Sequence, residues 1–179
     1  PMAPGSAPLS VSVNLSVTQV LADGLLELVA DHLDQTGLDP TRLVVELTEH
    51  VLVADEDLVA ARLDALRNLG VRLALDDFGT GWSSLRLVRS MPFDLIKVDR
   101  TFTADVDVTA EGADFAARIV ALARSMGRTV VAEGIERESQ LEALAGMGCH
   151  FGQGWLFGAP QPADRFHAAR ELGAGPAPS

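Results

Sequence analysis

The chain has 179 residues, of which 47% are hydrophobic and 22% charged, as is typical of one globular domain and not of a disordered segment. Its formal net charge of −11 excludes binding of polymeric nucleic acid through a basic surface, although metal ions held by carboxylates would still admit a small phosphate ligand. No apolar run approaches the ~18 residues of a membrane span, and the single Cys149 fits a reducing compartment, so we expect a cytoplasmic domain without a membrane segment.

Six short apolar runs, rich in valine, leucine and isoleucine, predict parallel strands that are buried on both faces. In chain order, the expected strands cover residues 10–15, 43–47, 72–76, 95–98, 129–132 and 150–152. Segments with apolar residues at helical spacing lie between and after these runs. The expected helices cover residues 18–36, 56–69, 83–88, 114–126, 139–147 and 163–172.

This alternation of strands and helices predicts an α/β fold, and the expected architecture is a TIM-type (β/α) barrel. A complete eight-stranded barrel typically takes ~250 residues, so we expect about six of the eight strand–helix units here. The two remaining units are expected to precede Pro1, because the chain closes with a helix and a tail. We expect one domain over residues 10–172, with a flexible start at 1–9 and a disordered tail at 173–179.

Polar residues recur where these strands end. Asp76 and Asp77 end the third apolar run and open a glycine loop, and two adjacent carboxylates repel each other unless a cation or proton lies between them. Other polar residues hold similar positions, namely Asn14, Glu46, Lys97, Glu133 and Gln153. Because α/β folds place their sites at the carboxyl ends of strands, these side chains predict a single site. Oxygen donors favour magnesium, manganese or calcium, and the four histidines lack the spacing of a zinc pair.

Several of these residues also have simpler interpretations. Asn14 could cap the following helix, although Ser16 or Thr18 is better placed to do so. Glu46 could form a buried salt bridge, and Lys97 could simply pair with Asp99.

The remaining acidic residues have simpler interpretations too. Asp76 and Asp77 could both be turn or cap residues, and Glu49 considered alone is better explained as a solvated loop residue. Glu133 and Glu136 could form an acidic cluster at a helix N-terminus.

Six motifs contain these strand ends, namely VNLS at residues 13–16, VELTE at 45–49, LDDFGTG at 75–81, IKVD at 96–99, AEGIE at 132–136 and GQGW at 152–155. Together they resemble the EAL domain family, which is known for cyclic di-GMP phosphodiesterases. They follow the family's order and spacing and span about residues 10–162. The Glu-Ala-Leu motif that lies on an earlier strand in the family and provides a metal ligand has no counterpart before the VNLS motif of this sequence.

The resemblance implies a site with two divalent cations, Mg²⁺ or Mn²⁺, whereas Ca²⁺ is expected to inhibit. By this resemblance, Asn14, Glu46 and Asp76 bind one metal ion, and Asp76 and Asp77 bind the second. Gln153 and Glu133 would hold metal-bound water. Lys97 would orient or deprotonate the attacking water.

The remaining roles concern the loop after the paired aspartates. Glu49 would anchor the loop 78–84, and Glu136 would support the site. The residues expected to form the loop beside the substrate are Phe78, Gly79, Thr80 and Gly81.

The function implied is hydrolysis of cyclic di-GMP to linear pGpG. The alternatives are a receptor that binds cyclic di-GMP without hydrolysing it, or an interaction module, because the first metal-binding glutamate is missing from the sequence. The resemblance also implies an upstream sensory or diguanylate cyclase domain and a possible homodimer. Residues 105–114 could lie at that dimer interface or form a plain surface loop.

Overall fold

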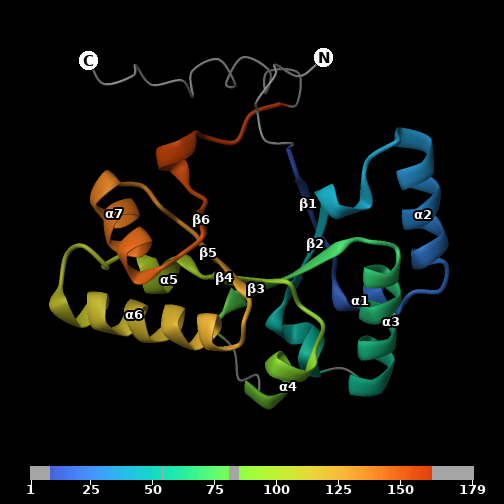
Figure 1. Ribbon diagram of the computed structural model, residues 1–179, viewed down its shortest axis with the longest axis horizontal. Coiled ribbons are helices and arrows are strands. Elements are labelled where there is room, and N and C mark those ends of the chain that lie inside the picture. Colours follow the sequence, from blue (N-terminus) through green and yellow to red (C-terminus); the bar gives the residue numbers. More distant parts are fainter. Residues whose placement is uncertain (1–8, 54, 81–84, 163–179) are drawn as a thin grey trace.

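The computed structural model describes residues 9–53, 55–80 and 85–162 and forms a parallel sheet flanked by helices (Figure 1). The six strands are β1 Val11–Asn14, β2 Leu43–Thr48, β3 Arg72–Phe78, β4 Leu95–Val98, β5 Thr129–Ala132 and β6 Phe151–Gly152. Their order in the sheet equals their order in the chain, and every neighbouring pair is parallel. The predicted strands are therefore confirmed, with β3 extending through both aspartates to Phe78.

Seven α-helices are described, and they connect the strands. They are α1 Val17–Leu21, α2 Leu25–Thr36, α3 Glu56–Asn68, α4 Leu85–Ser90, α5 Arg100–Thr103, α6 Ala110–Ser125 and α7 Glu138–Met147. Helices α1, α2 and α3 gather beside the β1 end of the sheet, and α5, α6 and α7 gather beside the β6 end (Figure 1). The expected helix over residues 163–172 lies outside the described residues, as does the tail at 173–179.

The prediction of one helix over residues 18–36 is wrong, because the chain breaks between α1 and α2. Ala22 is extended, and Gly24 takes the left-handed conformation with a φ of 82°. Ser16 caps α1 through a side chain that accepts a hydrogen bond from the Gln19 amide, as the sequence indicated. The short helix α5 was not expected, and α6 begins at Ala110, four residues before its predicted start. Residues 105–114 are therefore partly helical and not a plain loop.

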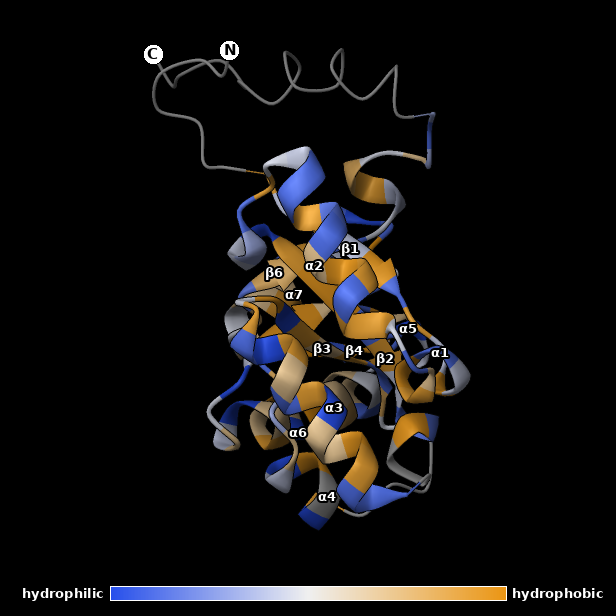
Figure 2. Ribbon diagram, turned by 90° about the vertical axis from the view of Figure 1, so that its right-hand side faces the viewer, coloured by the Kyte–Doolittle hydropathy of each residue, from blue (hydrophilic) through white to orange (hydrophobic). Residues whose placement is uncertain are grey.

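The core lies between the sheet and the helices that cover it. Strand residues such as Leu75 and Ile96 pack with Leu63 and Leu66 of α3 in one cluster of buried apolar side chains. Each such side chain stabilises the fold by about 1.5–3 kcal/mol. Figure 2 shows β2, β3 and β4 as a largely hydrophobic layer among helices that carry both hydrophilic and hydrophobic residues. None of the described helices is both long and apolar enough to cross a membrane.

Candidate active site

Lys97 of β4 lies at the centre of a cluster of carboxylates from β2, β3 and the end of β5. Its Nζ lies 2.6 Å from Oε2 of Glu46, 3.0 Å from Oδ1 of Asp76 and 2.7 Å from Oε1 of Glu133. Glu46 comes from β2 and Asp76 from β3, while Glu133 directly follows β5, so parallel strands bring the three groups together at one end of the sheet. The Lys97 side chain is 5% exposed and that of Glu46 9%.

The simpler interpretation in which Lys97 pairs with Asp99 is wrong. The Asp99 side chain instead caps α5 by accepting a hydrogen bond from the Thr101 amide at 2.9 Å. The simpler interpretation of Glu46 as a salt-bridged residue does describe its contact with Lys97. Lys97 therefore contacts carboxylates that lie on or after other strands, and not the carboxylate two residues further along its own segment.

The electrostatics of the cluster keep Lys97 charged. Burial alone would lower the pKa of Lys97, but hydrogen bonds to Glu133 and Glu46 outweigh burial and hold the pKa above its ordinary value. Burial raises the pKa of Glu133, although the hydrogen bond from Lys97 opposes that rise. A lysine held as an ammonium can orient a water molecule but cannot take its proton. Both roles expected for Lys97, orienting the water and deprotonating it, stay predictions.

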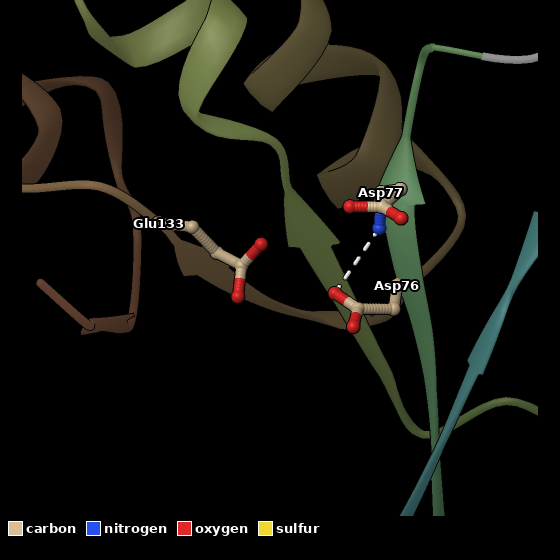
Figure 3. A group of neighbouring side chains, drawn as sticks. All are labelled: Asp76, Asp77 and Glu133. Atoms are coloured by element: carbon tan, nitrogen blue, oxygen red, sulfur yellow. Dashed lines mark hydrogen bonds between the residues drawn. The ribbon is translucent and has the colours of Figure 1, made fainter. Parts of the chain in front are cut away.

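A second group of carboxylates adjoins this cluster. One oxygen each of Asp76, Asp77 and Glu133 lies within 4.8 Å of the others (Figure 3). Asp77 donates its amide hydrogen to Oδ1 of Asp76 at 3.1 Å, and its φ of 56° is the only positive φ of a non-glycine residue in the described part of the chain. Left-handed backbone at such a residue costs about 1–2 kcal/mol, so the surrounding structure must hold it there.

The charges of this group favour a divalent cation. Burial raises the pKa of Asp77, and the like charges of Asp76 and Asp99 raise it further. A cation between the carboxylates would relieve that repulsion. The donors are all carboxylate oxygens, which are the ligands that Mg²⁺ and Mn²⁺ prefer. The residues present therefore fit a hard divalent ion.

Glu49 holds the start of the loop that follows β3. It begins a short 3₁₀ helix, η2 (Glu49–Val53), and its Oε1 accepts a hydrogen bond from the Gly79 amide at 2.6 Å. Glu49 is 5% exposed, so its interpretation as a solvated loop residue is wrong. Thr80 donates its hydroxyl hydrogen to the Asp77 carbonyl at 2.9 Å. The Phe78 side chain is buried in the main core, and Gly81 lies outside the described residues.

The other predicted residues lie around this centre without touching it. Asn14 ends β1 and pairs with Glu46 of β2 in the strand register. Gln153 follows β6, and its backbone amide donates a hydrogen bond to the Ala132 carbonyl. Glu136 is exposed and donates its amide hydrogen to Oε1 of Gln140. Within the described ranges, no hydrogen bond or ion pair joins the side chain of Asn14, Gln153 or Glu136 to Lys97.

A cavity of about 720 Å³ opens beside the carboxylates. Among its lining residues are Asp77, Glu133, Glu136 and Gln153, all of which the sequence indicated. It is also lined by three residues that the sequence reasoning missed, Asp99, Arg100 and Trp155, the last of which is 74% exposed. The signal for them was their place in the chain, since each ends or directly follows one of the six motifs at a strand end.

Comparison with known proteins identifies the family. The family model for the EAL domain matches residues 2–160. The chain belongs to the EAL domain family. That match contains all six motifs, so the resemblance found in the sequence is confirmed.

This EAL domain is similar to a longer curated protein from Pseudomonas aeruginosa, the bifunctional diguanylate cyclase/cyclic di-GMP phosphodiesterase MucR. The two are 38% identical over 165 residues, which are 92% of this chain and 24% of MucR. This chain spans only about a fifth to a quarter of the length of the curated relatives it matches.

Solved structures share the fold of this EAL domain. A structure of the MucR phosphodiesterase in complex with c-di-GMP has a TM-score of 0.80 at 38% identity, covering 87% of this chain and 63% of that one. The EAL domain of Mycobacterium smegmatis DcpA has a TM-score of 0.84 at 35% identity, covering 94% and 75%. Klebsiella pneumoniae BlrP1, solved with manganese and cyclic di-GMP, has a TM-score of 0.75 at 32% identity, covering 84% and 39%. The predicted barrel architecture is therefore confirmed.

Proposed function

We propose that this EAL domain is part of a metal-dependent phosphodiesterase that hydrolyses cyclic di-GMP to linear pGpG. The observation that carries the proposal is the convergence of Glu46, Asp76 and Glu133 on Lys97 beside a cavity that Glu133 and Asp77 line. The relatives support it, since MucR is named as a cyclic di-GMP phosphodiesterase and BlrP1 has been solved with manganese or calcium beside cyclic di-GMP.

The chain's own residues divide the work of binding and orientation. Asn14, Glu46, Asp76 and Asp77 would hold two divalent cations, Mg²⁺ or Mn²⁺, with Gln153 near their bound water. When bound, such ions polarise a phosphodiester and make water a better nucleophile. The Lys97 ammonium would orient that water, and Glu133, 2.7 Å away, would hold the ammonium in place. Hydrolysis adds water across one P–O bond and releases one ribose 3′-hydroxyl, which opens the ring of the substrate.

The charge of the cavity explains why a cation is needed. Its described lining carries the carboxylates Asp77, Asp99, Glu133 and Glu136 against one guanidinium, that of Arg100. An anionic dinucleotide would be repelled by this lining unless divalent cations reversed the local sign of the field. We therefore expect binding of cyclic di-GMP to depend on a divalent cation.

The non-hydrolysing receptor is not favoured, because every acidic residue of the six motifs is retained and those at the strand ends converge in space. The domain boundaries at residues 10 and 172, the roles of the individual site residues, the homodimer, the cytoplasmic location and an upstream sensory or diguanylate cyclase domain all stay predictions.

The replacement Asp76→Asn tests the proposal. Asp76 takes part in both carboxylate clusters, so its loss should lower the rate of pGpG formation with Mn²⁺ or Mg²⁺ by about a hundredfold or more. The rate is measured by chromatography of the products, with Asp34→Asn on the exposed surface of α2 as the matched control. Undiminished turnover in Asp76→Asn would sink the assignment. If the unmodified chain binds cyclic di-GMP with Ca²⁺ yet forms no pGpG with Mn²⁺, the receptor function is correct instead.

A further inference from the structure

The amide of Gln140, in the first turn of α7, is almost completely buried and bonds in two directions. Its Oε1 accepts hydrogen bonds from the backbone amides of Glu136 at 2.8 Å and Arg137 at 3.0 Å. Its Nε2 donates to the carbonyls of Thr103 at 3.2 Å and Ala104 at 3.1 Å. Gln140 is 1% exposed, and a buried amide with four partners costs a great deal to disturb.

Half of this pattern is ordinary helix capping. A glutamine at the third position of a helix commonly accepts a hydrogen bond from the backbone at the helix start, as Gln140 does from Arg137. Capping does not explain the two hydrogen bonds that Nε2 donates, because Thr103 and Ala104 lie in α5 and directly after it, more than thirty residues earlier in the chain. The Nε2 bonds therefore join two segments that follow different strands.

Helix α5 contacts both loops that carry candidate site residues. Thr103 donates its hydroxyl hydrogen to the Glu133 carbonyl at 2.5 Å. Arg100 lies so close to Gly134 that a Cβ on the glycine would come within 2.5 Å of the Arg100 Cβ. On the other side, a Cβ on Gly79 would lie 2.7 Å from the Phe102 ring. Because α5 has only four residues, it needs outside contacts to stay in place.

We propose that Gln140 is a positioning residue that clamps α5 to the 133–136 loop and thereby fixes Glu133 and Glu136 relative to Lys97. Gln140 touches neither the cavity nor the carboxylate cluster, so it acts only through the backbone that it holds. The proposal deepens the proposed phosphodiesterase function and rests on it for the effect on turnover, while the clamp itself is a structural property.

Two replacements of Gln140 separate clamping from capping. Gln140→Glu keeps an acceptor for the Glu136 and Arg137 amides and is a good capping residue, but it has no donor for the α5 carbonyls. Gln140→Met has a similar volume and loses both sets of bonds. The control is Leu144→Val in the same helix, which removes one buried methylene and leaves all four hydrogen bonds in place. Thermal unfolding of each variant shows whether their losses of stability match.

The experiment measures amide hydrogen exchange by NMR and steady-state hydrolysis of cyclic di-GMP with Mn²⁺ on the same samples. In Gln140→Glu the Phe102 and Ala104 amides of α5 should exchange at least about tenfold faster, while the Glu136 and Arg137 amides stay protected. In Gln140→Met all four should exchange faster. Both variants should lower kcat by about ten- to a hundredfold with little change in KM. Leu144→Val should neither speed amide exchange in α5 nor lower kcat.

The outcomes are distinct. If Gln140→Glu keeps both the α5 protection and the kcat of the unmodified chain, Gln140 only caps α7 and the proposal is wrong. If Leu144→Val lowers kcat as much as Gln140→Met, the effect is one of general stability and the proposal is again wrong. If the unmodified chain does not hydrolyse cyclic di-GMP, the proposed function fails, and exchange at Phe102 and Ala104 still decides whether the clamp exists.

Discussion

Lys97 is the only lysine in the chain, and it stands where three carboxylates meet. An ammonium group has three hydrogens to donate, so Glu46, Asp76 and Glu133 can each take one. A guanidinium is planar and would not match three partners around one nitrogen. Because three carboxylates face one cation, the centre keeps an excess of negative charge that a divalent ion can neutralise.

Removing the Lys97 charge should leave the surrounding carboxylates without a counter-ion and so destabilise the fold. We expect Lys97→Met to lower the free energy of unfolding in EDTA by about 3–5 kcal/mol, because it leaves buried carboxylates without a counter-ion. Added Mn²⁺ should raise the melting temperature of this variant more than that of the unmodified chain. Circular dichroism melts measure both effects.

The control for that measurement is Arg118→Met, which breaks a solvent-exposed pair with Asp114 one turn away on α6. Its melting temperature should be almost unchanged. Equal losses in Lys97→Met and Arg118→Met would show that the buried cluster contributes nothing special to stability.

For individual residues, the sequence predicted which side chains lie close together but not which hydrogen bonds and ion pairs they form. Strand ends in a parallel sheet meet at one edge, which is why Glu46, Asp76 and Glu133 could be grouped in advance. Their common partner could not be predicted, since the pairing of Lys97 depends on side-chain direction and register. Gln140 gave no signal, because a glutamine in an amphipathic helix is ordinarily a surface residue.

Among the helices, α5 is the one that the sequence did not predict. It has four residues, which is too short for apolar periodicity, and its start is marked only by the capping Asp99. The break between α1 and α2 was signalled by Asp23-Gly24, but the regular leucine spacing on both sides outweighed that signal. Strands were easier to predict, because short runs rich in valine, leucine and isoleucine between polar ends leave few alternatives.

Contact between α5 and the loop after β3 should make Gly79 intolerant of a side chain. Its φ is 98°, and an added Cβ would meet the Phe102 ring at 2.7 Å. We expect Gly79→Ala to lower the free energy of unfolding by about 1–2 kcal/mol from the backbone alone. The affinity of the Asp77 site for Mn²⁺ should fall too, because Asp77 lies two residues before Gly79. Urea unfolding and Mn²⁺ titration measure the two effects.

Gly146 provides the matched substitution. It lies in α7 with nothing within 4 Å of an added Cβ and no left-handed φ. Gly146→Ala should therefore raise the free energy of unfolding by about 0.5–1 kcal/mol. A stabilising effect at both glycines would contradict the contact between the loop and Phe102.

Across the whole molecule, the sheet has an edge at β1 that no other described strand pairs with. All four residues of β1 are exposed, and Val13 lines an apolar cavity of about 330 Å³ together with residues of α2 and β2. Open edges and apolar surface of this kind favour association. We expect the chain to self-associate as its concentration rises.

Sedimentation velocity over a range of concentrations measures that association. Val13→Lys should shift the chain toward monomer, because a charge on an edge strand opposes edge-to-edge pairing. Val108→Lys changes an equally apolar, exposed residue within residues 105–114. If Val108→Lys gives monomer and Val13→Lys does not, chains associate through the segment predicted by family resemblance and not through β1.

Because the spatial order of the strands equals their order in the chain, the sheet can be extended strand by strand as the chain is made. Each strand is added to the free edge left by the strand before it, and none has to be inserted between two partners already joined. During synthesis, Glu46, Asp76 and Lys97 are made before Glu133 and Gln153. Because Glu133 and Gln153 follow β5 and β6, the candidate site is complete only once these last two strands have been made and added to the sheet.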